Sequence, residues 1–189
     1  MTLSIENIKE TLADKKIIGL VIPDIGYNET LIKVVGALSK DYDKILYISI
    51  STPCESLADR FRRNKINTDK FYVIDCITRT EKDFVMTKNC IYVSSPKAID
   101  EIQSAILNII RAHKIDIVVI DSPSSLLTYY EHMDVLQFMH RLMSVLIISN
   151  CKGIFPFPRE SEGPLRRSVE LFTNKVIQLE PDTFDWSVS

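Results

Sequence analysis

The sequence predicts an α/β protein with a mostly parallel sheet that is flanked by helices on both faces. Short, continuous apolar runs recur along the chain, as at residues 17–22 and 117–120, and such runs are typical of parallel strands that are buried on both faces. Stretches with apolar residues at helical spacing separate them, as at residues 99–110. Strands that alternate with helices almost throughout favour a doubly wound parallel sheet.

Length and composition predict one globular domain. The 189 residues are 46 % apolar and 25 % charged, with a net charge of −2. We expect a single domain over 1–189, with a lead-in helix at 1–14 and a tail at 181–189. The sequence shows neither a secretory leader nor an apolar run of about 18 residues, so we expect a cytoplasmic protein without a membrane partner.

Each element has its own local evidence. Ile5, Ile8 and Leu12 stand at helical spacing in the lead-in segment, and Leu31 and Leu38 belong to the apolar stripe of the next helix. The predicted strands cover residues 17–22, 44–50, 71–75, 90–93, 117–121, 153–157 and 175–179. The predicted helices cover residues 1–14, 31–38, 55–63, 96–113, 133–148 and 164–173.

Two further features follow from local chemistry. Ser95 and Pro96 suit the cap and the first position of a helix, so the fourth helix is expected to begin there. The four cysteines are scattered without a C-x-x-C pair. We expect them to be reduced and mostly buried, and not to bind a metal, because zinc sites usually need closer ligand pairs.

The loop after the first strand, residues 23–30, has nearly the spacing of a Walker A phosphate loop. The pattern G-x-x-x-x-G-K-[ST], laid on Pro23 to Thr30, keeps Thr30, and Gly26 adds a further glycine. The lysine position holds Glu29. Two unit charges about 4 Å apart interact by roughly 4 kcal/mol at an effective dielectric constant near 20. The attraction between lysine and phosphate would therefore become repulsion.

The same residues also suit a plain capped helix start. Asn28 is a strong N-cap residue, worth about 1 kcal/mol, and Glu29 in the first turn complements the helix dipole. We expect Asn28 and Glu29 to cap the helix end where a phosphate would otherwise bind. A nucleotide site here, vestigial or rearranged, would use Asp24, Gly26, Asn28, Glu29 and Thr30.

Asp121 follows the apolar run 117–120 and has the form of a Walker B acid, which holds Mg²⁺. It also suits the start of a turn with the residues that follow, Ser122 to Ser125. An ATPase would want a carboxylate after the second strand, to orient the attacking water. Ser51 and Thr52 stand there instead.

The order of these motifs resembles the RecA/KaiC superfamily of P-loop ATPases, in the compact single-domain form common in archaea. The resemblance covers roughly residues 15–180. It includes the degenerate loop, the runs 46–49 and 71–75, the run 118–122 that ends in the acid, and the run 175–180. By position it implies a phosphate loop at 23–30, a magnesium acid at Asp121 and a catalytic glutamate pair at Ser51 and Thr52. Only the magnesium acid is kept.

These losses favour a non-catalytic RecA/KaiC-like domain, a pseudo-ATPase without a cofactor. The superfamily resemblance implies a protein partner or self-association in a ring. The alternative is an ATPase or nucleotide sensor with ATP and Mg²⁺ in a rearranged site, where Asp121 would hold the metal. We predict no catalytic residue.

A nucleic-acid-binding module is a third hypothesis. It would use Arg62 and Arg63 in a basic helix end, with Arg166 and Arg167 in the segment after the sixth strand. These four arginines could equally contact a neighbouring subunit. The net charge of −2 counts against nucleic acid.

Overall fold

The computed structural model describes residues 5–81, 89–160, 167 and 170–179. A seven-stranded sheet forms its centre, in the order β4-β3-β2-β5-β6-β1-β7, with every neighbouring pair parallel. The strands are β1 Ile17–Ile22, β2 Ile45–Ser49, β3 Phe71–Asp75, β4 Cys90–Tyr92, β5 Ile117–Asp121, β6 Lys152–Pro158 and β7 Lys175–Gln178. The predicted parallel α/β fold is confirmed.

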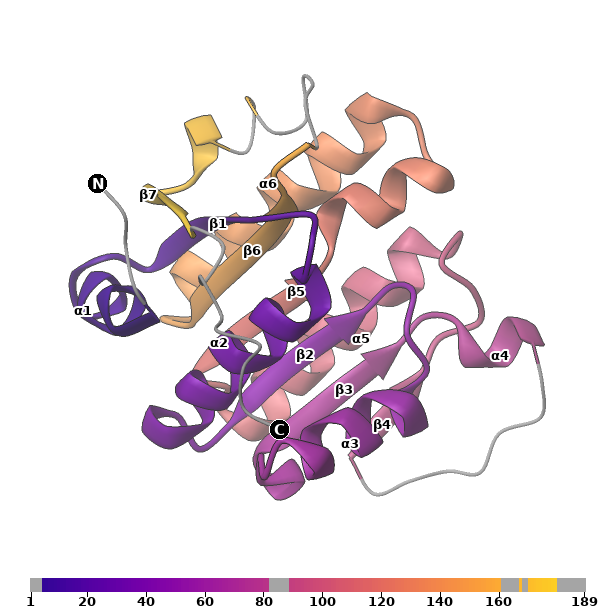
Figure 1. Cartoon of the computed structure of the whole chain (residues 1–189). Helices are drawn as coiled ribbons and strands as arrows, with labels where there is room; N and C mark the ends of the chain where they lie inside the picture. Colours follow the sequence, from indigo (N-terminus) through magenta and orange to yellow (C-terminus); the bar gives the residue numbers. More distant parts are fainter. Residues whose placement is uncertain (1–4, 82–88, 161–166, 168–169, 180–189) are drawn as a thin grey trace.

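Helices cover both faces of the sheet (Figure 1). The α-helices are α1 Ile5–Asp14, α2 Tyr27–Asp41, α3 Cys54–Arg63, α4 Thr78–Glu81, α5 Ile99–His113 and α6 His132–Ile148. Two short 3-10 helices, η1 Thr68–Lys70 and η2 Pro123–Thr128, complete the described elements. Buried side chains of α1, α2 and α3 form a core with one face of the sheet, and those of α5 and α6 form a second core with the other.

Strand burial explains why the apolar runs are continuous. All six residues of β1 and all five of β2 are buried, because alternate side chains point into different cores. In β1, for example, Ile17 belongs to the α5/α6 core, and Ile18 belongs to the α1/α2/α3 core.

Helix starts depart most from the sequence prediction. The fourth predicted helix, α5, begins at Ile99 and not at Ser95–Pro96. The Ser95 hydroxyl accepts a hydrogen bond from the Lys97 amide at 3.1 Å, so it caps a preceding turn. The Ile99 amide instead donates to the hydroxyl of Tyr130 at 2.9 Å. A residue from a distant part of the chain thus supplies the acceptor that a local cap was expected to provide.

One described helix differs from the prediction, and parts of the predicted elements lie outside the described residues. Thr78–Glu81 forms the short helix α4, which is not among the helices predicted from the sequence. Half of the predicted helix 164–173, the whole tail 181–189 and residues 1–4 lie outside the described residues. None of the described helices is long and apolar enough to cross a membrane.

Candidate functional site

Because all seven strands are parallel, the segments that follow them gather at one edge of the sheet, where ligands bind in open α/β sheets. The loop between β1 and α2 lies at this edge. Gly26 is the residue before α2 and has a φ of 75°, a left-handed conformation that glycine adopts without strain. The helix therefore begins at Tyr27, and Asn28 falls inside it.

The prediction that Asn28 caps α2 is therefore wrong. The cap position holds Gly26, without a side-chain hydrogen bond. Asn28 and Glu29 are exposed and Thr30 is half-buried. Glu29 does lie in the first turn, as expected. It places a negative charge beside the helix N-terminus, where a phosphate group would need to bind.

Asp24 ties this loop to the neighbouring strand. Its carboxylate accepts a hydrogen bond from the Glu160 amide at 3.0 Å, just beyond the end of β6. Its carbonyl oxygen accepts one from the Tyr27 amide at 3.3 Å. Asp24, expected among the nucleotide contacts, is thus engaged in holding the loop in place.

Two tyrosine hydroxyls converge on the carboxylate of Asp121. Tyr47 donates to Oδ2 at 2.6 Å and Tyr27 donates to Oδ1 at 3.4 Å. Tyr27 is the first residue of α2, and it reaches across β6, which lies between β1 and β5. The predicted magnesium acid therefore has a protein hydroxyl on each of its oxygens.

Strand register explains the Tyr47–Asp121 contact. In the pairing of β2 with β5, Tyr47 lies beside Val119 and Ser49 lies beside Asp121. Side chains two residues apart on one strand share a face, so Tyr47 and Asp121 point toward the same side of the sheet. The ring of Tyr47 is buried and meets Phe61 of α3 edge to face at 5.9 Å. This packing fixes the hydroxyl where it reaches the carboxylate.

Burial dominates the electrostatics of this cluster. Loss of solvent raises the pKa of Asp121 above its ordinary value, and the hydrogen bonds from Tyr47 and Tyr27 and the positive charge of Arg60 oppose that rise. Burial and the neighbouring Asp121 raise the pKa of Tyr47 and of Tyr27 far above that of a free phenol. Both phenols therefore remain hydrogen-bond donors throughout the physiological pH range.

This pKa shift predicts a pH-dependent effect of Asp121→Asn. The carboxyl of Asp121 has a higher pKa in the folded protein than in the unfolded chain. Its protonation therefore stabilises the folded protein at pH values below the pKa of the unfolded chain, and this stabilisation is lost as pH rises through the pKa of the folded protein. Asp121→Asn cannot ionise. The wild type therefore loses stability relative to this variant as pH rises. In urea titrations, the free energy of unfolding of Asp121→Asn minus that of the wild type should increase from about pH 3 to about pH 7.

Asp43→Asn provides the contrast. The Lys70 ammonium hydrogen-bonds Asp43 and lowers the pKa of that carboxyl, so the stabilisation is present above the unfolded pKa and is lost as pH falls. The free energy of unfolding of Asp43→Asn minus that of the wild type should therefore decrease as pH rises. Equal slopes for the two variants would contradict the burial of the Asp121 charge.

Asp75 is a second strand-end carboxylate, and the sequence analysis missed its role. It is fully buried and lies beside Ser49, which separates it from Asp121 in the sheet. Its oxygens accept hydrogen bonds from the Cys54 amide at 2.7 Å, from the Ile77 and Thr78 amides at 2.9 Å each, and from the Thr78 hydroxyl at 2.6 Å. Asp75 therefore fastens the starts of α3 and α4 to the sheet.

The turn after β2 has no acid where the resemblance would place the catalytic glutamates. Ser51 is exposed, and the Ser49 hydroxyl closes the turn by donating to the Thr52 carbonyl at 2.6 Å. Within the described part of the chain, no three His, Cys, Asp or Glu side chains are grouped where they could hold a metal ion.

These contacts do not fit a Mg-nucleotide. A phosphate at the start of α2 would lie near the negative charge of Glu29, and the hydroxyls of Tyr27 and Tyr47 donate to the oxygens of Asp121 that a cation would need. Binding would require both hydroxyls to turn away from a partly buried carboxylate. The Tyr47 hydrogen bond at 2.6 Å to a charged group is worth roughly 1.5–3 kcal/mol and the 3.4 Å contact from Tyr27 less, so this displacement would be costly.

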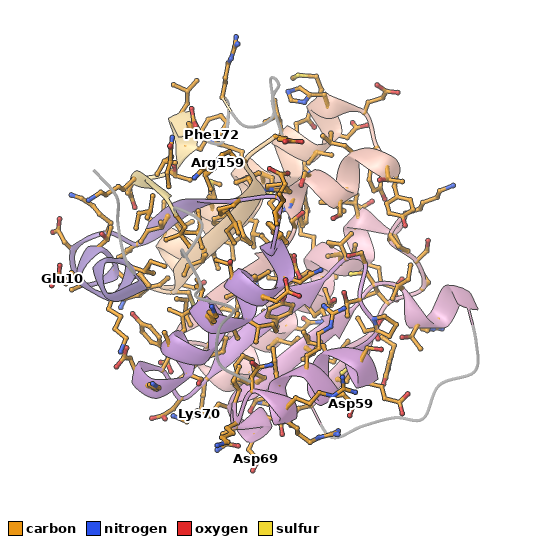
Figure 2. The ribbon with its side chains drawn as sticks, in the orientation of Figure 1. Glu10, Asp59, Asp69, Lys70, Arg159 and Phe172 are labelled. Atoms are coloured by element: carbon orange, nitrogen blue, oxygen red, sulfur yellow. The ribbon has the colours of Figure 1, made fainter. Side chains whose placement is uncertain are left out.

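The basic residues do not form one surface. Arg62 is paired with Asp59 on α3, and Arg63 is exposed on the same helix. Arg167 is exposed and precedes Phe172, whose ring contacts His140 of α6 at 5.0 Å. Asp59 and Phe172 lie at opposite ends of the molecule (Figure 2). Arg166 lies outside the described residues.

Tyr27 and Tyr47 are the site residues that the sequence analysis missed. Tyr47 could have been found from the pairing of the runs 45–49 and 117–121, since in-register parallel pairing puts both side chains on one face. Tyr27 had no such evidence, because its contact depends on where α2 begins.

The fold defines the class of protein, an α/β domain with a RecA-like parallel sheet. The structure is similar to that of a KaiC-like protein from the hyperthermophilic archaeon Pyrococcus horikoshii OT3, with a TM-score of 0.62 and 13 % identity. The match covers 90 % of this chain and 74 % of the other. By sequence the chain belongs to a family of unknown function, DUF7090, whose model matches residues 1–185. No curated protein matches the chain.

Proposed function

We propose that this protein is a non-catalytic RecA/KaiC-like domain, a pseudo-ATPase that acts as a protein-interaction or regulatory subunit. The observation that carries the proposal is the pair of hydroxyls from Tyr27 and Tyr47 on the two oxygens of Asp121. Both oxygens that a metal ion would need already accept hydrogen bonds from the protein, and the charge of Glu29 in the first turn of α2 disfavours a phosphate there.

The second strand-end carboxylate supports the same function. Four hydrogen-bond donors of the protein already use Asp75, so it is not available to orient a water for attack. A site for hydrolysis needs a base within hydrogen-bond reach of that water. The exposed turn at Ser51 and Thr52 offers only hydroxyls.

Exposed apolar side chains support a role in protein binding. Ile25 at the tip of the loop after β1 is 93 % exposed, and Ile148 at the end of α6 is 84 % exposed. Leu171, in the segment before β7, is 83 % exposed. Contiguous apolar surface marks protein interfaces, and we propose these three side chains as positions where a partner makes contact. The partner is a second protein or further copies of this chain in a ring, without a nucleotide cofactor.

Thermal melting tests the proposal. Millimolar Mg-ATP should leave the melting temperature of the wild type unchanged, and Asp121→Ala should likewise show no nucleotide effect. A ligand at about 100 times its dissociation constant would add about 2.7 kcal/mol to the free energy of unfolding. A saturable stabilisation that Asp121→Ala abolishes would instead establish the rearranged nucleotide site.

A further inference from the structure

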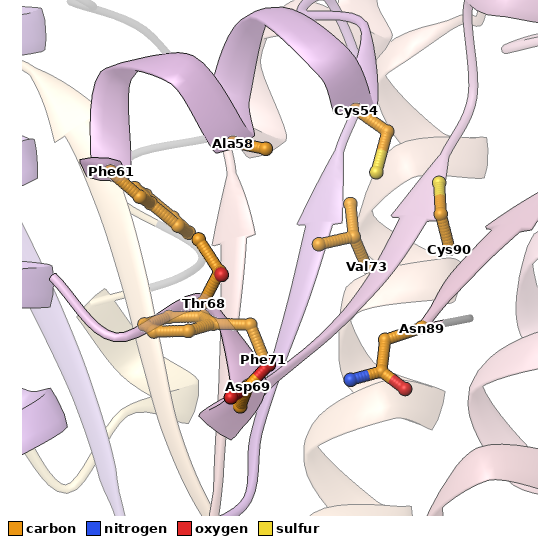
Figure 3. Close-up of a pocket in the computed structure, with 9 residues that line it drawn as sticks. All are labelled: Cys54, Ala58, Phe61, Thr68, Asp69, Phe71, Val73, Asn89 and Cys90. Atoms are coloured by element: carbon orange, nitrogen blue, oxygen red, sulfur yellow. The ribbon is translucent and has the colours of Figure 1, made fainter. Parts of the chain in front are cut away.

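Two of the four cysteines, 36 positions apart in the chain, lie close together in space. Cys54 is the first residue of α3, and Cys90 is the first residue of the edge strand β4. Their sulfur atoms point toward one another at one end of a pocket (Figure 3). The Cys54 thiol lies near enough to raise the pKa of Cys90.

The pocket gives small molecules access to this pair. It has a volume of about 170 Å³, and Phe61, Phe71 and Val73 line it together with the two cysteines. Cys54 is 8 % exposed and Cys90 is 6 % exposed. The other two cysteines differ, since Cys76 is fully buried and Cys151 donates its thiol hydrogen to the Ile115 carbonyl at 3.0 Å.

We propose that Cys54 and Cys90 form a reversible redox site, which a hydroperoxide oxidises to an intramolecular disulfide. This inference is independent of the proposed loss of nucleotide binding. It rests on the facing thiols, on the pocket that reaches them, and on the charge of the surroundings.

The local charge favours a disulfide over a bound soft metal ion. The Asp75 carboxylate lies next to the pair, since its Oδ2 accepts a hydrogen bond from the Cys54 amide at 2.7 Å. Two thiolates around a monovalent cation would keep a net negative charge in an apolar pocket beside this carboxylate, which is unfavourable. A disulfide is neutral, and its formation removes both thiol protons.

The chemistry assigns a role to each cysteine. Cys54 has a helix N-terminus to stabilise a thiolate and Cys90 does not, so Cys54 attacks the peroxide, although the nearby Asp75 carboxylate keeps its thiolate fraction small at neutral pH. The O–O bond breaks, Cys54 becomes a sulfenic acid, and the departing hydroxide takes up a proton to form water. The Cys90 sulfur then displaces the sulfenic hydroxyl, which leaves with the Cys90 proton as a second water. Two thiols lose two electrons, and one hydrogen peroxide is reduced to two waters.

The rate of this reaction should depend on pH. The neighbouring Cys54 thiol and burial both raise the pKa of the Cys90 thiol, and the thiolate is the reactive form. The second step, in which Cys90 displaces the sulfenic hydroxyl of Cys54, should therefore be slow at neutral pH and faster at alkaline pH.

Peptide mapping tests the proposal. The full-length protein is treated with hydrogen peroxide, alkylated in denaturant and digested without a reductant. We expect a peptide that links Cys54 to Cys90, formed within one chain and removed by dithiothreitol, with Cys76 and Cys151 alkylated. The oxidised protein should melt several degrees higher, because the crosslink closes the chain from residue 54 to residue 90.

Matched variants complete the experiment. Cys54→Ser and Cys90→Ser should each abolish the crosslink, whereas Cys76→Ser should keep it. Alkylation of all four cysteines after peroxide treatment of the wild type would overturn the proposal. A disulfide between two chains, or one that uses Cys76 or Cys151, would overturn it as well, and neither outcome depends on whether a variant folds.

Discussion

Replacing Asp75 with alanine should lower the free energy of unfolding by about 4 kcal/mol. The carboxylate is fully buried and accepts four hydrogen bonds, three of them from the backbone amides of Cys54, Ile77 and Thr78. Alanine would leave these amides without an acceptor at the starts of α3 and α4. A buried donor that loses its partner costs roughly 1–3 kcal/mol, and the three losses occur in one region.

Urea denaturation with a common slope measures this loss. Asp75→Asn should lower the free energy of unfolding by less than Asp75→Ala does, because the side-chain carbonyl oxygen still accepts hydrogen bonds. Some loss remains, because the side-chain amide group faces the other donors. Asp69→Ala, at an exposed position, is the matched control and should change stability by less than about 0.5 kcal/mol. If Asp75→Ala unfolds at the same urea concentration as the control, then Asp75 does not hold the helix starts.

Phe61→Ala should cost a similar amount, about 4 kcal/mol. Phe61 is 1 % exposed and joins α3 to the sheet. Its ring centroid lies 4.6 Å from that of Phe71 and 5.9 Å from that of Tyr47. The substitution removes both aromatic contacts and enlarges the pocket that Phe61 already lines. A cavity next to Tyr47 also loosens the hydroxyl that holds Asp121.

The melting temperature is the readout for this variant, with an expected decrease of about 10 °C for a domain of this size. Arg63→Ala is the control on the exposed side of the same helix, and it should melt within about 2 °C of the wild type. Equal melting temperatures for Phe61→Ala and Arg63→Ala would show that α3 does not depend on this ring for its packing.

The parallel sheet could be predicted from sequence because burial on both faces makes its strands apolar throughout. Every residue of β1 is buried, and this is why residues 17–22 read as one continuous run. The position of Asp121 at a strand end follows from the same pattern, since the apolar run stops where the sheet meets the loops.

The contacts around the site could not be predicted in the same way. Asn28 is a good cap residue, but Gly26 adopts a left-handed conformation and starts α2 two residues earlier. That shift places Tyr27 at the helix N-terminus, from where it reaches Asp121. The Asp75 hydrogen bonds join residues up to 21 positions apart, so no local pattern reports them.

Calorimetric titration of Mg-ATP into the wild-type protein tests the central claim most directly. Tyr27 and Tyr47 donate hydrogen bonds to both oxygens of Asp121, and Glu29 lies in the first turn of α2. We therefore expect injection heats no larger than the heats of dilution, up to millimolar nucleotide. A saturable binding heat would contradict it and would mean that the two tyrosines release Asp121 to a metal-bound nucleotide.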